Sequence, residues 1–453
     1  MKRAPHAAAA AFPLLLVVLF CGFKAETAST VDVPIIVTSA PSYDPLAALH
    51  GVERFPRGAR LMLVRDGKAE PLLPDFAASA DASVSFDAAT ILFAGKKSSG
   101  DAWQIWELTV ADHSVRAVTS GATDAVRPLY LPGGRLVFAR REPQGFRLVA
   151  ADRDGTNELP LTYVPASAIP ADVLADGRIL FEAAYPLGSG NTPELFLVYS
   201  DGSGVESYRC DHGIARWGGH QLASGDVVLT HGTSLARFTS PLAHEVGIVA
   251  PHGDYAGGVI ESPSGEWLVS LRASAGAPFE LKLLNRASTA MTTVLARPGE
   301  NLVEPVLLAT RTRPRQHPSG LHDWDYANLL ALDARLSREG ALRAAPAQVR
   351  LETLNASGNV VAIGASPVES DGSFFVKAPA DRPIRFVVLD EKGTIIRQEH
   401  GWFWIRRGEQ RICVGCHTGP ERASENNLPA VLLRSTTPTD LTGAGTPAEK
   451  GSR

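Results

Sequence analysis

Residues 131–138 read LPGGRLVF, a turn with two glycines followed by a short apolar strand. A short turn followed by an apolar strand recurs as FDAATILF at 86–93, LADGRILF at 174–181, LASGDVVL at 222–229 and SPSGEWLV at 262–269, and each of these turns but the first holds one glycine. The five copies end at positions 93, 138, 181, 229 and 269, so the intervals are 45, 43, 48 and 40 residues. Because propeller blades repeat at this length, the pattern predicts a mainly β fold built as a β-propeller.

A second strand follows most of the copies, as in WQIWEL at 103–108 and LFLVY at 195–199. Four strands fit into one period. A further blade over about 34–73, whose segment PIIVT at 34–38 is free to pair with the last blade, brings the count to six. We therefore expect a six-bladed β-propeller over residues 29–310. Five or seven blades, or an all-β sandwich with similar turns, are the alternatives.

The repeat fades after Ala296, and the segment RTRPRQHPS at 311–319 has the composition of an extended, solvated connector. We assign residues 311–347 to this connector. Strand patterns return at 348–354, 374–376 and 384–389, which predicts a small β-sandwich-like domain of five or six strands over residues 348–433. Residues 434–453, rich in Thr, Gly, Pro and Ser, are expected to be a disordered tail.

The N-terminus predicts export. Met1-Lys2-Arg3 precedes an apolar run, LLLVVLF at 14–20, and polar residues begin at Lys24. This is the pattern of a signal peptide, assigned here to residues 1–28, and it places the mature chain in the periplasm or outside the cell. A membrane anchor is the alternative, but the run is shorter than the roughly 20 residues that span a bilayer. We expect no membrane span in the mature chain.

Composition excludes one class of partner. The chain of 453 residues has a formal net charge of -4 and no basic stripe that could neutralise phosphates, so nucleic acid is not an expected ligand. Only three cysteines remain after residue 28, namely Cys210, Cys413 and Cys416, which is too few for a disulfide framework.

The segment Cys413-Val414-Gly415-Cys416-His417 is a motif that predicts cofactor binding. Two thiols separated by two residues can add to the two vinyl groups of a haem, and a histidine directly after the second thiol lies beneath the iron. The motif predicts one covalent haem c, with His417 as the proximal iron ligand. Two other readings of the motif are a thioredoxin-like redox pair and a structural zinc site. The redox pair would need a βαβ context, which the all-β surroundings lack, and the zinc site would need a second pair of ligands, which the solitary Cys210 does not supply.

Side chains before the motif fit a haem crevice. Trp402, Phe403 and Trp404 offer flat apolar surfaces, and three arginines could neutralise the propionates: Arg406, Arg407 and Arg411. The alternative is that these aromatic residues are ordinary core and that the arginines are solvated.

The sequence does not identify the second axial ligand of the iron. After the signal only Met62 and Met291 remain, and the repeat region holds them, so methionine ligation is not expected. Three histidines are candidates for the distal ligand: His317, His322 and His400. A vacant distal position is the alternative.

The chain resembles the hydrazine synthase alpha-subunit-like proteins, which join a TolB-type propeller to a haem-bearing domain. The resemblance rests on SVSFD at 83–87, on PVE at 367–369 through DGSF at 371–374, and on GEQR at 408–411 leading into the haem motif. In hydrazine synthase a tyrosine four residues beyond the motif histidine ligates the iron, and that histidine binds zinc. Glu421 stands at this position, so it is the alternative axial ligand, and hydrazine chemistry is not implied.

These observations favour periplasmic electron transfer to an unidentified redox partner, with the propeller as a docking platform. A haem enzyme that binds a small substrate at an open iron is the main alternative. A binding module with a structural haem is a third.

Overall fold

The computed structural model describes residues 31–443, except 188–189, 210–212, 242, 338–339, 400 and 416–427. The predicted signal peptide and the second half of the predicted tail, residues 444–453, therefore lie outside the described residues, as do Cys210, His400, Cys416, His417 and Glu421.

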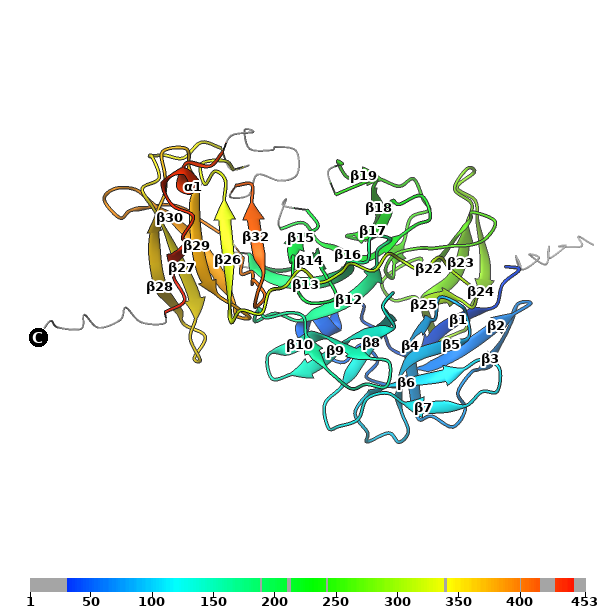
Figure 1. The fold of residues 1–453 in the computed structure, drawn as a ribbon. Coiled ribbons are helices and arrows are strands. Elements are labelled where there is room, and N and C mark those ends of the chain that lie inside the picture. The colour runs from blue at the N-terminus through cyan, green and yellow to red at the C-terminus, as the bar shows by residue number, and fades with distance from the viewer. Residues whose placement is uncertain are drawn as a thin grey trace, which may run out of the picture.

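Residues 35–307 form six antiparallel sheets, which we call sheets 1–6 and together the ring (Figure 1). Sheet 1 consists of β25 (Asn301–Leu307), β1 (Ile35–Ala40), β2 (Arg60–Arg65) and β3 (Lys68–Pro71). Sheet 2 consists of β4 (Ala78–Val84), β5 (Thr90–Lys96), β6 (Gln104–Thr109) and β7 (Val115–Ala117). Sheet 3 consists of β8 (Ala125–Tyr130), β9 (Arg135–Glu142), β10 (Gly145–Asp152) and β11 (Leu159–Pro160).

The remaining sheets of the ring follow the same plan. Sheet 4 consists of β12 (Ala168–Val173), β13 (Ile179–Leu187), β14 (Gly190–Val198) and β15 (Glu206–Ser207). Sheet 5 consists of β16 (Arg216–Gln221), β17 (Val227–His231), β18 (Ser234–Phe238) and β19 (Val246–Gly247). Sheet 6 consists of β20 (Asp254–Tyr255), β21 (Ile260–Glu261), β22 (Trp267–Arg272), β23 (Glu280–Leu284) and β24 (Met291–Leu295). The mainly β, propeller-like character predicted from the sequence is confirmed.

The apolar runs that identified the repeat are β5, β9, β13, β17 and β22, each the second strand of its sheet. Successive side chains of a strand point to opposite faces. In β5, Phe93 packs in the core shared with sheet 1, whereas Leu92 packs in the core shared with sheet 3. The runs are apolar without alternation because each of these strands is buried on both faces.

Sheet 1 joins the two ends of the ring. Its innermost strand β25 comes from the C-terminal end and pairs antiparallel with β1, where Ile35 is opposite Leu307. The predicted pairing of segment 34–38 with a strand from the C-terminal end of the repeat is therefore present, as the pairing of β1 with β25. This pairing joins the N-terminal and C-terminal ends of the ring within one sheet.

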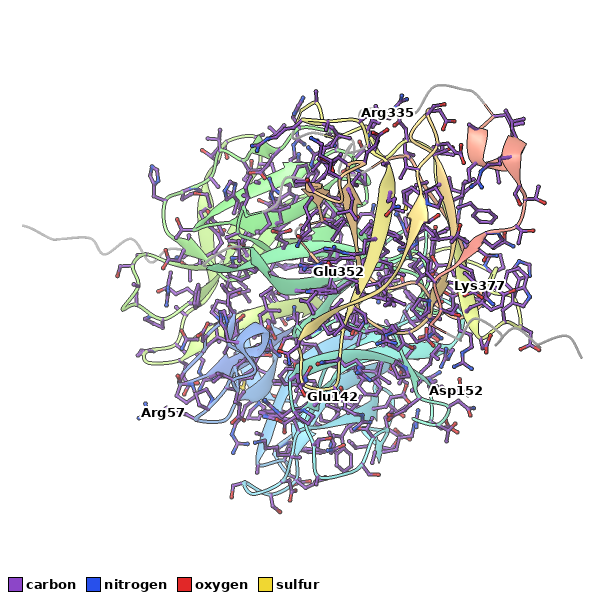
Figure 2. All side chains as sticks on the ribbon, turned by 90° about the vertical axis from the view of Figure 1, so that its left-hand side faces the viewer. Arg57, Glu142, Asp152, Arg335, Glu352 and Lys377 are labelled. Atoms are coloured by element: carbon purple, nitrogen blue, oxygen red, sulfur yellow. The ribbon has the colours of Figure 1, made fainter. Side chains whose placement is uncertain are left out.

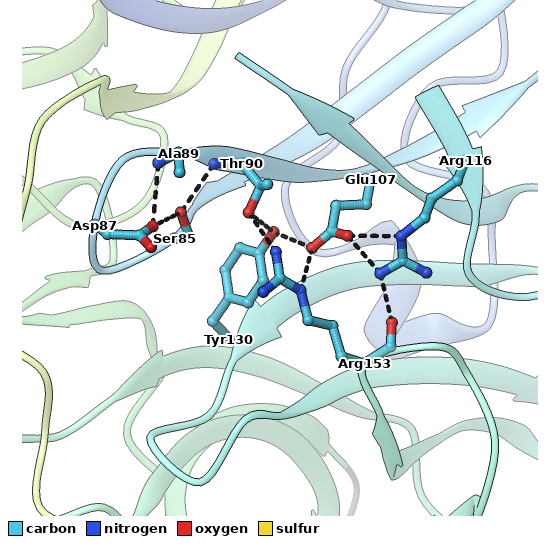
Figure 3. A network of polar contacts seen from close by, with 8 residues as sticks. All are labelled: Ser85, Asp87, Ala89, Thr90, Glu107, Arg116, Tyr130 and Arg153. Carbon is cyan, nitrogen blue, oxygen red and sulfur yellow. Dashed lines mark hydrogen bonds and ion pairs between the residues drawn. The ribbon is translucent and has the colours of Figure 1, made fainter. Parts of the chain in front are cut away.

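Polar networks add to the apolar packing between sheets, as between sheets 2 and 3 (Figure 3). The carboxylate of Glu107 on β6 is 5% exposed and accepts hydrogen bonds from Tyr130 Oη and Arg153 Nε, each at 2.8 Å. Tyr130 Oη also lies 2.8 Å from Thr90 Oγ1. Burial raises the pKa of Tyr130, so its hydroxyl keeps the proton that it shares with Glu107.

Residues 326–443 form a C-terminal domain of two four-stranded sheets around one apolar core (Figure 2). One sheet consists of β32 (Gln410–Cys413), β26 (Tyr326–Ala331), β29 (Phe374–Pro379) and β33 (Thr439–Asp440). The other consists of β28 (Val360–Pro367), β27 (Gln348–Leu354), β30 (Ile384–Leu389) and β31 (Ile395–Gln398). The short helix α1 (Ala430–Arg434) packs on β29.

The observed strands extend this domain beyond the expected range of 348–433. β26 lies within the segment assigned to the connector, and β33 lies within the segment assigned to the tail. The sequence did not predict β26 as a strand because its alternation of buried and exposed side chains is short: only Ala327, Leu329 and Ala331 are buried there. The domain therefore has eight described strands, of which six lie within 348–433, the range expected to hold five or six.

Residues 308–325, which we call the connecting segment, cross the ring between β25 and β26 (Figure 1). Their side chains are largely exposed, as the composition predicted. Their backbone is nevertheless anchored, because Arg311 N donates to Phe86 O and Arg315 N to Ala175 O, each at 3.0 Å. Two different sheets of the ring hold the segment in place.

Candidate functional site

Strand β32 positions the first cysteine of the motif. It is an edge strand that pairs in parallel with β26, where Cys413 is opposite Ala331. Cys413 is half-buried, and its side chain packs against the core of the C-terminal domain. Burial raises the pKa of the Cys413 thiol to about 11, so the thiol is neutral near pH 7.

Apolar side chains that face solvent surround Cys413 in the sequence. Ile412 is 65% exposed and Val414 is 37% exposed. On the far side of residues 416–427, Leu428 is 62% exposed and Leu433 is 70% exposed. Exposed apolar side chains therefore flank residues 416–427 in the sequence on both sides.

The aromatic residues before the motif pack the C-terminal domain against the ring. Trp404 is fully buried in the core between sheets 3 and 4, and its indole N–H donates to Gly202 O at 3.1 Å. Phe403 packs against both this core and that of its own domain. Trp402, only partly buried, lies beneath the guanidinium of Arg385, 4.7 Å from the ring centroid. For Trp404 and Phe403 the structure supports the alternative reading, ordinary core.

Two of the three arginines are also engaged. Arg406 pairs with Asp381, donates to Asp201 O at 2.9 Å and donates to Tyr163 Oη at 2.6 Å. Arg411 makes a bidentate contact with Glu409, at 2.9 and 2.7 Å. The remaining one, Arg407, is exposed. These contacts leave Arg407 as the arginine of the three that is available to a propionate.

The described distal candidates have partners of their own. The ring of His317 stacks on Tyr199 of sheet 4, with centroids 3.9 Å apart. His322 stacks on Trp324 at 4.3 Å, and its Nε2 accepts a hydrogen bond from the Gln410 side-chain amide at 2.8 Å. The third candidate, His400, lies outside the described residues.

Among the described residues no group of three or more His, Cys, Asp or Glu side chains could hold a metal ion. Of the three motif residues expected to hold the haem, the structure describes Cys413 alone, and the His417 and Glu421 assignments stay predictions. No described helix has the length and apolar character needed to span a membrane.

Sequence reasoning missed a buried charge network at the centre of the ring. Arg54 pairs with both Asp81 and Glu304, and Arg127 Nη1 contacts Glu304 Oε1 at 2.7 Å. Tyr43 Oη donates to the same oxygen at 3.4 Å. These residues are far apart in sequence and share no motif, so no local signal could have found them.

The family model for the middle domain of the hydrazine synthase alpha subunit matches residues 334–418. The Kuenenia stuttgartiensis hydrazine synthase subunit alpha is 40% identical over 60 residues, which are 13% of this chain and 7% of that subunit. The matched stretch is thus a small part of the relative.

Solved structures extend the likeness to the fold. Kuenenia stuttgartiensis hydrazine synthase aligns with a TM-score of 0.78 and 18% identity, over 90% of this chain and 72% of that chain. TolB from Acinetobacter baumannii aligns with a TM-score of 0.47 and 14% identity, over 62% of this chain and 68% of that chain. Residues 334–418 are thus similar to the middle domain of the hydrazine synthase alpha subunit, and the chain shares the fold of the Kuenenia stuttgartiensis hydrazine synthase structure.

Proposed function

We propose that this chain is an exported protein that carries one covalent haem c on Cys413 and Cys416, with His417 as the proximal iron ligand, and that it transfers single electrons to a periplasmic partner. Each of the six sheets of the ring is one propeller blade in this proposal, and the ring is the docking platform. The observation that carries it is the haem motif, which begins on edge strand β32 among exposed apolar side chains.

The surroundings of Cys413 fit a thioether better than a thiolate. A thioether is apolar and has no proton to lose, whereas redox-active and zinc-binding cysteines act as thiolates. The raised pKa of Cys413 disfavours the thiolate. Burial against the core therefore supports haem attachment over the two rival readings of the motif.

The exposed neighbours of Cys413 offer a place for the macrocycle. Ile412 and Val414 present apolar surface to solvent, which a porphyrin face would cover. Arg407 is free to meet a propionate. When bound, haem c supplies the one-electron iron couple on which electron transfer depends.

A second function, catalysis on a small molecule at an open iron, is favoured by the histidines. His317 is occupied by Tyr199, and His322 by Trp324 and Gln410. Recruiting either as a distal ligand would break these contacts. A haem enzyme needs a vacant distal position, where a substrate can bind the iron. An enzymatic function also agrees with the similarity of residues 334–418 to the hydrazine synthase alpha middle domain.

Optical spectra of the purified holoprotein, oxidised and reduced, test the proposal. A covalent haem should stay with the chain on a denaturing gel stained for haem peroxidase activity, and the stain should vanish in Cys413→Ser with Cys416→Ser. A double variant that stains like the wild type would end the proposal. Carbon monoxide then separates the two functions, because only a five-coordinate or weakly ligated reduced iron binds it readily.

A further inference from the structure

A cavity of about 1090 Å³ lies at the centre of the ring. The innermost strands β4, β8, β12, β16 and β25 contribute to its walls, together with β21. The helix η1 (Ala47–His50) reaches it on one side, and residues Ala309–Arg315 of the connecting segment lie along the other. The volume is that of a pocket for a ligand of drug size.

The floor of the cavity is built with strained backbone. Asp81, Arg127 and Glu304 all have positive φ angles, of 60°, 55° and 55°, and each lies where its strand pairing shifts register. Residues other than glycine rarely adopt this conformation, and it is kept where surrounding structure or function requires it. In Asp81, Arg127 and Glu304 the positive φ angle brings charged side chains together around Arg54. These four residues are what we call the floor of the cavity.

Charge on the floor is nearly balanced. Asp81 and Glu304 face Arg54 and Arg127, and the carboxylate of Glu182 accepts from Gly218 N at 2.7 Å. Glu304 Oε2 is buried without a hydrogen-bond partner among the described residues. The floor is therefore polar, but it holds no excess of positive charge.

The opposite side of the cavity has unpaired positive charge. Arg311, Arg313 and Arg315 alternate along the extended connecting segment, and all three line the cavity. The guanidinium of Arg311 lies 4.4 Å from the Phe86 ring centroid, and that of Arg313 lies 5.6 Å from it. None of the three forms an ion pair with a carboxylate in the part of the chain that the structure describes.

Two further carboxylates, those of Asp172 and Glu261, line the cavity and offset part of this charge. Asp172 acts electrostatically on Arg311, and its carboxylate also lies 2.9 Å from His220 Nδ1 and accepts from Gln221 N at 2.8 Å. Glu261 accepts from Ala223 N at 3.1 Å. Arginine recognises carboxylate and phosphate groups through paired hydrogen bonds, and three arginines along one extended segment favour a ligand with several such groups.

From this arrangement we propose that the central cavity binds an organic or inorganic polyanion, with two or more carboxylate or phosphate groups held by Arg311, Arg313 and Arg315. The site is separate from the haem segment and does not depend on the proposed haem. Citrate serves as the polycarboxylate probe, pyrophosphate as the phosphate probe and acetate as the single-charge reference.

Isothermal titration of the full-length holoprotein tests the site. Citrate or pyrophosphate should bind, acetate should bind at least about tenfold more weakly, and affinity should fall as salt rises. The preference between the first two probes tells which chemistry the natural ligand has. Failure of both to bind the wild type would overturn the proposal, as would acetate binding of equal strength.

Variants assign the binding to the arginines. Arg313→Gln with Arg315→Gln removes two guanidinium groups that make no hydrogen bond to described side chains, so the fold should survive. It should weaken binding about tenfold or more, because each lost arginine removes a charge-assisted contact. Thermal melting checks that the variant is folded.

The matched control is Arg57→Gln with Arg65→Gln, which makes the same change in net charge at exposed positions; Figure 2 shows Arg57 at the periphery. It should change affinity by less than about twofold. Equal weakening in both pairs would show a diffuse effect of net charge and would contradict a site at the connecting segment.

Discussion

The cavity floor and the candidate haem segment contrast in how their chemical groups are assembled. On the floor, Arg54, Asp81, Arg127 and Glu304 come from four separate parts of the chain and meet inside the ring. In the haem segment, the two cysteines and the histidine stand within five consecutive residues on and after an edge strand. The first depends on the whole fold, whereas the second depends on local sequence.

This contrast predicts separable effects of mutation. A buried ion pair that loses one partner leaves an uncompensated charge, so changes on the floor should reduce stability strongly. Changes in the candidate haem segment should alter the cofactor while leaving the ring folded. Each variant below is therefore followed by two readouts, a haem spectrum and an unfolding curve.

The largest spectral effect is expected for His417→Ala. Removing the proximal imidazole should leave the haem attached through the two thioethers but shift its spectrum and potential substantially. Glu421→Ala should change the spectrum much less, because carboxylates are weaker ligands than imidazole at most haem irons. Resonance Raman spectra of the two variants make the comparison, and a large change confined to Glu421→Ala would reverse the ligand assignment.

The largest stability effect is expected for Arg54→Met. Asp81 and Glu304 would stay buried without their shared cation, at a cost of about 3–5 kcal/mol in the free energy of unfolding. Urea denaturation measures it. The control, Arg65→Met at an exposed position, should change stability by less than about 0.5 kcal/mol.

A compensating variant sharpens the test. Arg54→Met with Asp81→Asn and Glu304→Gln removes the charges together and should recover part of the loss, because neutral buried groups cost less than unpaired charges. The haem spectrum should be unchanged in all three variants. A floor variant that altered the spectrum would show that the two regions are coupled.

The sequence predicted local features and missed those that depend on tertiary contacts. Turns such as the one at Gly177 and apolar runs such as 179–181 repeat with the period of the sheets, so the repeating sheets of the ring could be predicted from the sequence. The floor was not, since the positive φ of Asp81 or Arg127 leaves no trace in residue type. The role of Trp404 at the boundary between the domains was also hidden, because an aromatic residue beside a haem motif fits a core and a crevice equally well.

Glu304→Gln should change the pH dependence of stability. Burial raises the pKa of Glu304 to about 7 from an ordinary 4.5, against the opposing charges of Arg54 and Arg127. The folded state then binds more protons than the unfolded state between these values, so the stabilising contribution present below pH 4.5 is lost as the pH rises to about 7.

Subtracting the unfolding free energy of the Glu304→Gln variant from that of the wild type isolates this contribution. The difference should decline by about 1–3 kcal/mol across the interval, and the floor geometry requires the decline to run in that direction. A difference that rises with pH would show that the arginines, rather than burial, dominate the pKa of Glu304.

Gly177→Ala should loosen the connecting segment. Gly177 has a φ of +89°, and a Cβ added there would lie 2.1 Å from Arg315 O, so the segment must move away. Trypsin should then cut after Arg315 several times faster than in the wild type, since Pro314 already blocks the bond after Arg313. The control is Gly225→Ala, at a similar turn with open space around it. Equal cleavage of both variants would argue against the contact.

The smallest effect is expected for His322→Ala, which tests one of the three candidates for the distal ligand. The ring of His322 stacks on Trp324 and its Nε2 accepts from Gln410, which precedes Cys413 by three residues on β32. An extended strand rises about 3.3 Å per residue, so Gln410 and Cys413 are about 10 Å apart along β32. Because the nitrogen that would face an iron is already hydrogen-bonded, removing it should leave the haem spectrum and carbon monoxide affinity unchanged. A spectral change as large as that of His417→Ala, with stability preserved, would make His322 the distal ligand and favour electron transfer over an open catalytic iron.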